Sequence, residues 1–163
     1  MKTVFLVRHA KSSWDHPGLR DFDRPLGDRG IKDAPKMAAW LAGTGVRPDA
    51  LVSSTANRAL TTAGYFAEAF GIDEKEIREE PAIYEAFTQT IIDLIRAFPD
   101  DWQTVLIFGH NPTFTSVANQ FSARLDNLPT CGIVRIDGQL SRWSEWSSSR
   151  AMVAGIWYPK LFK

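Results

Sequence analysis

Residues 3–9, Thr3-Val4-Phe5-Leu6-Val7-Arg8-His9, decide the fold that this sequence predicts. The apolar part, residues 3–7, is too short for a stable helix and rich in β-favouring residues, which is typical of a buried strand. The run ends abruptly at Arg8 and His9, so the strand presents two polar side chains at its C-terminal end. In open α/β sheets, ligands bind at this end of the strands.

The rest of the chain alternates between helical and strand-like patterns. Residues 10–30 are dense in Pro, Gly, Ser and Asp and predict a long ordered loop of the kind that commonly carries function. Helices are expected at about residues 31–42, 56–70, 88–98 and 112–121, and further strands at 49–53 and 104–108, with 79–84 as a connecting strand or loop. The first helix has Ile31, Ala34, Ala38 and Leu41 spaced to share a face.

The C-terminal part changes character. Residues 132–137, 140–146 and 152–157 are separated by Gly or Ser turns and predict strands that close the sheet. Its tryptophans are expected to fill the core rather than to form a stacking surface. Strands and helices joined by right-handed crossovers imply an α/β fold, a three-layer α/β/α sandwich with a largely parallel central sheet.

Length and composition indicate one domain spanning residues 1–163. Lys plus Arg and Asp plus Glu number 19 each, so no global field favours nucleic acid or an anionic membrane as a partner. No apolar run approaches the roughly 20 residues of a membrane-spanning helix. The lone Cys131 has no partner for an internal disulfide, and Arg8 interrupts the N-terminal apolar run too early for a signal peptide. A cytoplasmic location is therefore expected.

Three segments carry candidate chemistry. Arg8-His9, the segment leading to Arg58, and His110 each lie just past a predicted strand, so they are expected to converge on one edge of the sheet. Phosphoryl transfer needs positioned cations and one good nucleophile. Arginine binds phosphate with a planar fork, and a neutral imidazole has a free lone pair near neutral pH. Each residue alone is more commonly structural, and only the joint pattern indicates chemistry.

The joint pattern resembles a known family. Residues 6–14, Leu6-Val7-Arg8-His9-Ala10-Lys11-Ser12-Ser13-Trp14, resemble the Arg-His-Gly signature of the histidine phosphatase superfamily, in which the His is the phosphorylated nucleophile. Residues 51–63 resemble its second block, whose Arg binds phosphate, and residues 105–112 resemble its third, whose His also contacts the phosphoryl group. The resemblance implies a phosphoglycerate mutase-like fold, no metal and no organic cofactor. It also implies His9 as the nucleophile in a phosphate pocket formed by Arg8, Arg58 and His110.

Within the superfamily, residues 20–30, Tyr84-Glu85-Ala86 and the small size resemble the SixA-type phosphohistidine phosphatases. That resemblance implies a phosphorylated protein as substrate and partner, such as a histidine phosphotransfer domain. The absence of an insertion that could form a lid predicts a shallow, open pocket. Two alternatives stay open: a phosphatase of small phosphomonoesters, and a phosphate-binding module without turnover.

The acidic residues allow more than one interpretation. Glu85 falls where many relatives carry the acid that protonates the leaving group and then activates water; the alternative is an ordinary exposed glutamate at the start of a helix. The loop acids Asp15, Asp21 and Asp23 could substitute for it, but Asx turns or ion pairs with the loop arginines Arg20 and Arg24 are the favoured interpretation.

Two positions depart from the family pattern. Ala10 replaces the usual Gly of the signature, which makes a positive φ less comfortable there. Asp15 stands where mutase-like relatives commonly place Asn, and its charge would repel an anion. The second departure argues against a phosphoglycerate mutase.

Overall fold

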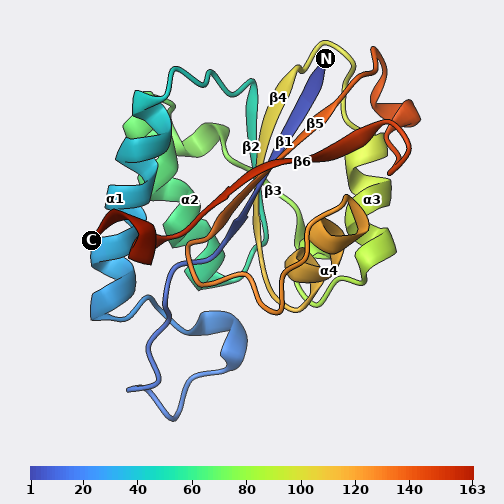
Figure 1. Ribbon diagram of the computed structural model, residues 1–163. Coiled ribbons are helices and arrows are strands. Elements are labelled where there is room, and N and C mark those ends of the chain that lie inside the picture. Colours follow the sequence, from blue (N-terminus) through green and yellow to red (C-terminus); the bar gives the residue numbers. More distant parts are fainter.

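The computed structural model describes residues 1–163, which form a six-stranded sheet between two layers of helices (Figure 1). The strand order is β3-β2-β4-β1-β5-β6. The strands are β1 (Lys2–Arg8), β2 (Ala50–Ser53), β3 (Arg78–Glu79), β4 (Thr104–Gly109), β5 (Ile133–Gly138) and β6 (Ala151–Trp157). The pairings among β1 to β4 are parallel and those of β5 are antiparallel. The predicted α/β sandwich with a largely parallel sheet is confirmed.

The helices divide between the two faces of the sheet. They are α1 (Asp28–Gly43), α2 (Asn57–Phe70), α3 (Thr88–Arg96) and α4 (Thr113–Gln120), with short 3-10 helices η1 (Asp21–Asp23), η2 (Glu74–Glu76), η3 (Pro81–Ile83), η4 (Trp143–Glu145) and η5 (Pro159–Phe162). In Figure 1, α1 and α2 cover one face, and α3 and α4 cover the other. Strand β1 serves both layers: Val4 and Leu6 pack toward the α3 and α4 side, Phe5 and Val7 toward α1 and α2.

Two expectations about individual elements were wrong. Helix α1 begins at Asp28 rather than Ile31, and Ile31 is 50% exposed instead of sharing the buried face. Residues 140–146 form no strand; they contain η4, and Trp143 and Trp146 are both fully buried. Side chains three residues apart point to opposite faces of a strand but to the same side of a helical turn. Burying both tryptophans in one core therefore requires the helical turn.

The tryptophans of the C-terminal region confirm the core-filling prediction. Trp143 and Trp146 pack against each other with ring centroids 5.5 Å apart and lie in the core on the α3 and α4 side. Trp157 lies on the other side, where its ring is 5.0 Å from that of Trp40 on α1.

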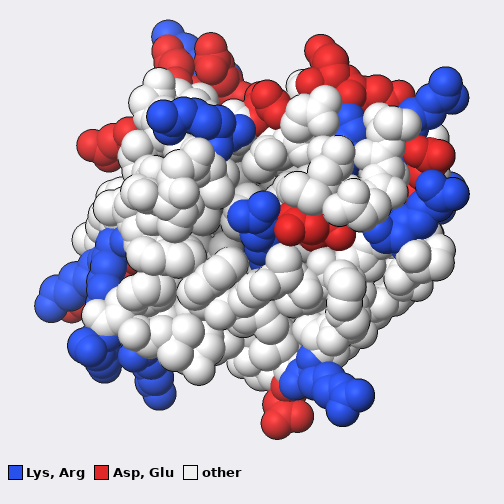
Figure 2. Space-filling model, turned by 45° about the horizontal axis from the view of Figure 1, so that its top comes forward, with Lys and Arg blue, Asp and Glu red and all other residues white.

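The surface shows no concentration of one sign of charge on the face drawn in Figure 2. There, Lys and Arg side chains are interspersed with Asp and Glu around a broad uncharged area. None of the helices combines the length and the apolar character needed to cross a membrane.

The loop between β1 and α1 is closed at its base by backbone contacts. Ser13 N donates to Pro25 O at 2.8 Å, and Gly27 N donates to Lys11 O at 2.9 Å. Gly30 lies directly against this base: a Cβ at this position would be 2.2 Å from the Lys11 carbonyl oxygen. Glycine at position 30 therefore allows α1 to start close to the strand end that carries His9.

Replacing Gly30 with alanine is expected to destabilise the protein by about 2–4 kcal/mol, because the new methyl group meets backbone that cannot rotate away. Gly43, in the same helix, has nothing within 4 Å of its Cβ position and provides the matched control. Gly43→Ala is expected to leave the free energy of unfolding unchanged or to raise it by up to about 1 kcal/mol. Denaturant unfolding of both variants tests this, and equal stability of Gly30→Ala and wild type would contradict it.

Candidate functional site

The parallel pairing of β1 and β4 brings two histidines together. Arg8 is opposite Gly109 in the register, so His9 and His110 both follow at the carboxyl ends of adjacent strands. Their ring centroids lie 5.3 Å apart. Arg58, in the first turn of α2, lies close enough to depress the pKa values of both histidines and of Arg8. The structure thus brings Arg8, His9, Arg58 and His110 to one site.

His9 is held with one ring nitrogen free. It is 7% exposed, and its Nδ1 lies 2.8 Å from the carbonyl oxygen of Ala10. Because a carbonyl oxygen only accepts, Nδ1 carries the proton and Nε2 keeps its lone pair. The backbone is fixed on both sides, since His9 N donates to Gly109 O and His9 O accepts from Cys131 N, each at 3.0 Å. The hydrogen bond to Ala10 O thus sets the tautomer of His9, which the sequence alone leaves open.

The Ala10 substitution for glycine is accommodated. Ala10 is fully buried and is not among the residues with positive φ, so its methyl group imposes no backbone strain. Its N–H donates to Thr62 Oγ1 at 3.0 Å, which ties the residue after His9 to α2.

His110 has one partner on the protein and one free ring nitrogen. Its Nε2 lies 2.8 Å from Ser54 Oγ, while Nδ1 is buried without a hydrogen-bond partner. Its ring also packs edge-on against Tyr84, with centroids 5.5 Å apart.

Both histidines are expected to remain neutral in mildly acidic solution. Burial, together with the positive charge of the nearby Arg58, lowers the pKa of His9 to about 3 and that of His110 to about 4. A lowered pKa means that the neutral form persists as the pH falls, so the ring resonances of both should keep their neutral positions at pH 5. A pH titration by NMR, assigned with His9→Ala and His110→Ala, checks this. Titration of either ring near pH 6.5 would contradict the geometry.

The two arginines of the site are each anchored by only part of their guanidinium group. Arg8 donates from Nη1 to Leu128 O at 2.9 Å, and its Nε is buried without a partner. Burial, followed by the Arg58 charge, lowers the pKa of Arg8. The Arg58 side chain is 9% exposed and donates to Asp21, from Nη1 to the main-chain oxygen at 2.7 Å and from Nη2 to Oδ2 at 2.9 Å. Several N–H groups of each arginine remain available.

Asp21 makes contacts at this site that the sequence did not predict. The sequence favours an Asx turn or an ion pair with Arg20 or Arg24 for the loop acids, and the structure pairs Asp21 with Arg24 at 3.0 Å and Asp23 with Arg20 at 2.9 Å. In addition, Oδ2 of Asp21 accepts from Arg58 and, at 2.8 Å, from the Tyr84 hydroxyl. Burial alone would raise the pKa of Asp21, but these three donors hold it at about 2. No sequence spacing indicates a contact between residues so distant along the chain.

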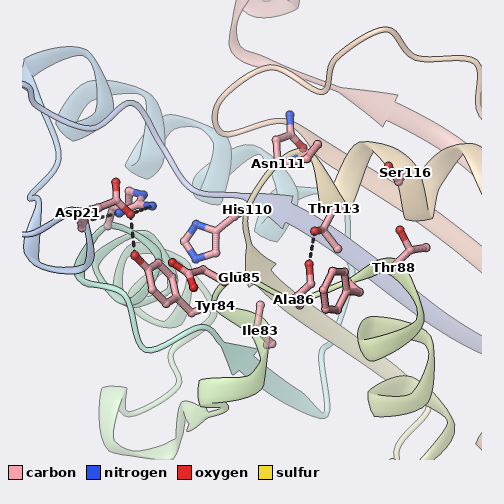
Figure 3. Close-up of a pocket in the computed structure, with 13 residues that line it drawn as sticks. Asp21, Ile83, Tyr84, Glu85, Ala86, Thr88, His110, Asn111, Thr113 and Ser116 are labelled. Atoms are coloured by element: carbon pink, nitrogen blue, oxygen red, sulfur yellow. Dashed lines mark hydrogen bonds and ion pairs between the residues drawn. The ribbon is translucent and has the colours of Figure 1, made fainter.

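A pocket of about 500 Å³ lies beside Arg58 and His110, while Arg8 and His9 are not among its lining residues (Figure 3). Its other lining residues include Asp21, Tyr84 and Glu85, together with Thr88 and Thr113 at the starts of α3 and α4. Glu85 is exposed and has a φ of 58°, in the left-handed region that non-glycine residues rarely adopt. The structure thus places the predicted acid at the pocket, beside Tyr84. No group of three or more His, Cys, Asp or Glu side chains is arranged to hold a metal ion.

Comparison with known proteins agrees with this arrangement. The family model of the histidine phosphatase superfamily (branch 1) matches residues 4–128. An uncharacterized protein of Mycobacterium tuberculosis is 32% identical over 167 residues, covering 94% of this chain and 100% of its own. A crystal structure of a protein named SixA, from Agrobacterium tumefaciens, is 33% identical, with a TM-score of 0.83 over 97% of this chain and 98% of that one. A protein histidine phosphatase SixA solved with tungstate has the same fold at 19% identity, with a TM-score of 0.83 over 99% of each chain. The chain belongs to branch 1 of the histidine phosphatase superfamily.

Proposed function

We propose that this phosphatase hydrolyses phosphohistidine on a protein substrate, with His9 as the nucleophile. The observation that carries the proposal is the pair of buried polar atoms without partners, Arg8 Nε and His110 Nδ1, in a cluster with Arg58 and a neutral His9. A buried donor without a partner is costly, and a phosphoryl oxygen would satisfy it. Arg8 and Arg58 supply two positive charges for a phosphoryl dianion.

The first chemical step is in-line attack of His9 Nε2 on phosphorus. The new P–N bond forms as the bond from phosphorus to the leaving group breaks, while Arg8, Arg58 and His110 stabilise the charge on the equatorial oxygens. Ser54 Oγ accepts from Ala56 N at 3.2 Å and can donate its own proton to His110 Nε2. That arrangement puts the ring proton of neutral His110 on Nδ1, where it serves as a donor to phosphate.

The second step returns the enzyme to its starting state. Glu85, at the pocket wall, protonates the departing group in the first step and then accepts a proton from the water that attacks phospho-His9. The P–N bond to His9 breaks, inorganic phosphate is released, and the lone pair returns to Nε2.

Three features favour a protein-borne phosphohistidine over other phosphorylated groups. The pocket is open, and the chain carries no inserted segment that would cover it, so a side chain on a large partner has access. The likeness to the Agrobacterium tumefaciens SixA structure extends over nearly the whole chain at 33% identity. A nitrogen leaving group also demands less of a general acid than an alkoxide, which suits a glutamate as exposed as Glu85.

The test compares initial rates on a phosphohistidine-bearing phosphotransfer domain, a phosphoserine peptide and small phosphomonoesters, each with and without a chelator. The proposal expects the highest kcat/KM on phosphohistidine, unaffected by the chelator. Faster turnover of phosphomonoesters would favour a small-molecule phosphatase. Phosphate-dependent binding without any turnover would favour a binding module.

A further inference from the structure

The charges around the pocket are unevenly distributed. Its lining residues include one positive side chain, Arg58, and two carboxylates, Asp21 and Glu85. Arg58 faces the phosphate position and is already paired with Asp21, whose side chain is 52% exposed. Apart from Arg58, no lining residue is a lysine or an arginine; the other lining side chains are the two carboxylates, the His110 imidazole, and hydroxyl, amide and apolar groups.

In-line displacement sends the leaving group away from His9. His9 is buried and does not line the pocket, whereas Arg58 and His110 do, so the open space beside these two residues and the two carboxylates is where the leaving group can go. The two arginines of the site and Arg24, the buried arginine that pairs with Asp21, carry three positive charges, whereas a phosphoryl dianion, Asp21 and Glu85 carry four negative ones. One net negative charge remains, so a negatively charged leaving group would add to an existing excess and a cationic one would cancel it.

The helix starts in the pocket do not reverse this balance. The N-termini of α3 and α4 lie at its outer end, at Thr88 and Thr113. At α4, the N–H of Thr115 donates to the Asn111 side chain at 3.2 Å. Helix N-termini contribute partial charges that fade within a turn, whereas each carboxylate is a full charge beside His110 and Arg58.

We propose that Asp21 is a specificity-determining residue whose carboxylate disfavours leaving groups with a negative charge and favours neutral or cationic ones, such as the nitrogen-bearing side chains of a protein. This rests on the phosphatase function proposed above and assigns one residue to the choice of leaving group. Asp21 also orients Arg58 through two hydrogen bonds, one to its main-chain oxygen and one to its carboxylate. The test must therefore separate the selection of charge from the positioning of Arg58.

Phosphoethanolamine and phosphoglycolate make that separation possible. They are similar in size and share the phosphate, but they end in an ammonium and a carboxylate respectively. Calorimetric titration gives the ratio of their dissociation constants, in which any general weakening of phosphate binding cancels. The wild-type protein is expected to bind phosphoethanolamine more tightly than phosphoglycolate. Asp21→Asn is expected to reduce that preference by about tenfold, because the Asp21 carboxylate is half exposed and solvent screens its interaction with the charge on the ligand.

Two variants serve as controls. Asp23→Asn removes another carboxylate of η1, which pairs with Arg20 and not with Arg58. This variant should leave the ratio of the two dissociation constants unchanged. Tyr84→Phe removes a hydrogen bond to Asp21 but keeps the charge, so it should retain the preference even if inorganic phosphate binds less tightly.

The outcomes distinguish this inference from the proposed function. An unchanged ratio in Asp21→Asn, an equal change in Asp23→Asn, or tighter binding of phosphoglycolate by wild type would overturn the role of Asp21. So would binding of inorganic phosphate without binding of phosphoethanolamine. If inorganic phosphate itself fails to bind, the phosphate pocket is wrong, and the proposed function falls together with this inference.

Discussion

Replacing His9 with alanine is expected to lower kcat/KM for phosphohistidine by about 10⁴- to 10⁶-fold, the size of effect seen when a covalent nucleophile is removed. The structure offers no second nucleophile in the same position, because His110 is engaged by Ser54 through Nε2. Rapid-quench assays of the purified variant measure the loss. His16→Ala, which removes an exposed histidine of the long loop, is the matched control and should retain wild-type turnover.

The phosphoryl group of the covalent intermediate is expected on Nε2 of His9. The reason is that Nδ1 of His9 donates to the Ala10 carbonyl and has no free lone pair. Acid-labile phosphate on His9 after a brief incubation with substrate, assigned to Nε2 by ³¹P and ¹H NMR, would show it. Phosphate found on Nδ1, or a His9→Ala protein as active as His16→Ala, would rule out the mechanism.

Replacing Arg58 with alanine is expected to lower kcat/KM by about 10²- to 10³-fold, the typical cost of removing one oxyanion donor from a partly buried site. Arg58→Lys should recover little of this loss. An ammonium group lacks the planar fork that donates to Asp21 and to phosphate at the same time.

Steady-state kinetics of both Arg58 variants check this prediction. Arg47→Ala, which removes an exposed arginine outside the site, controls for the loss of one positive charge from the protein. Full recovery of activity in Arg58→Lys would mean that position 58 needs only a charge and that its paired geometry is irrelevant.

The parts of the fold that follow local patterns were predictable from the sequence. The β1 strand and its polar end, the strand before His110 and the Gly71 that ends α2 in the left-handed conformation all have short-range signals. The local sequence around Trp143 wrongly predicts a strand, because aromatic residues between turns are typical of strands. Its conformation depends on a core contributed by distant elements, which no local window contains.

The candidate site divides in the same way. Arg8, His9, Arg58 and His110 could be named because each follows a recognisable motif, and the structure places all four together. The contact of Asp21 with Arg58 and Tyr84 could not be predicted. It depends on how the long loop returns across the sheet edge, and that path is set by tertiary contacts such as the buried Arg24.

The spacing between the two histidines is set by backbone pairing rather than by their side-chain surroundings. Each histidine directly follows a strand, and the β1–β4 register aligns those strand ends residue by residue. Core side chains on either face of the sheet can therefore change in volume over evolutionary time, moving both strands together without separating the histidines. Only a slip in register would part them, and a slip of one residue would also turn every apolar side chain of the strand to the opposite face. The geometry of the pair should thus outlast most of the sequence around it, in keeping with the shared fold of a SixA phosphatase at 19% identity.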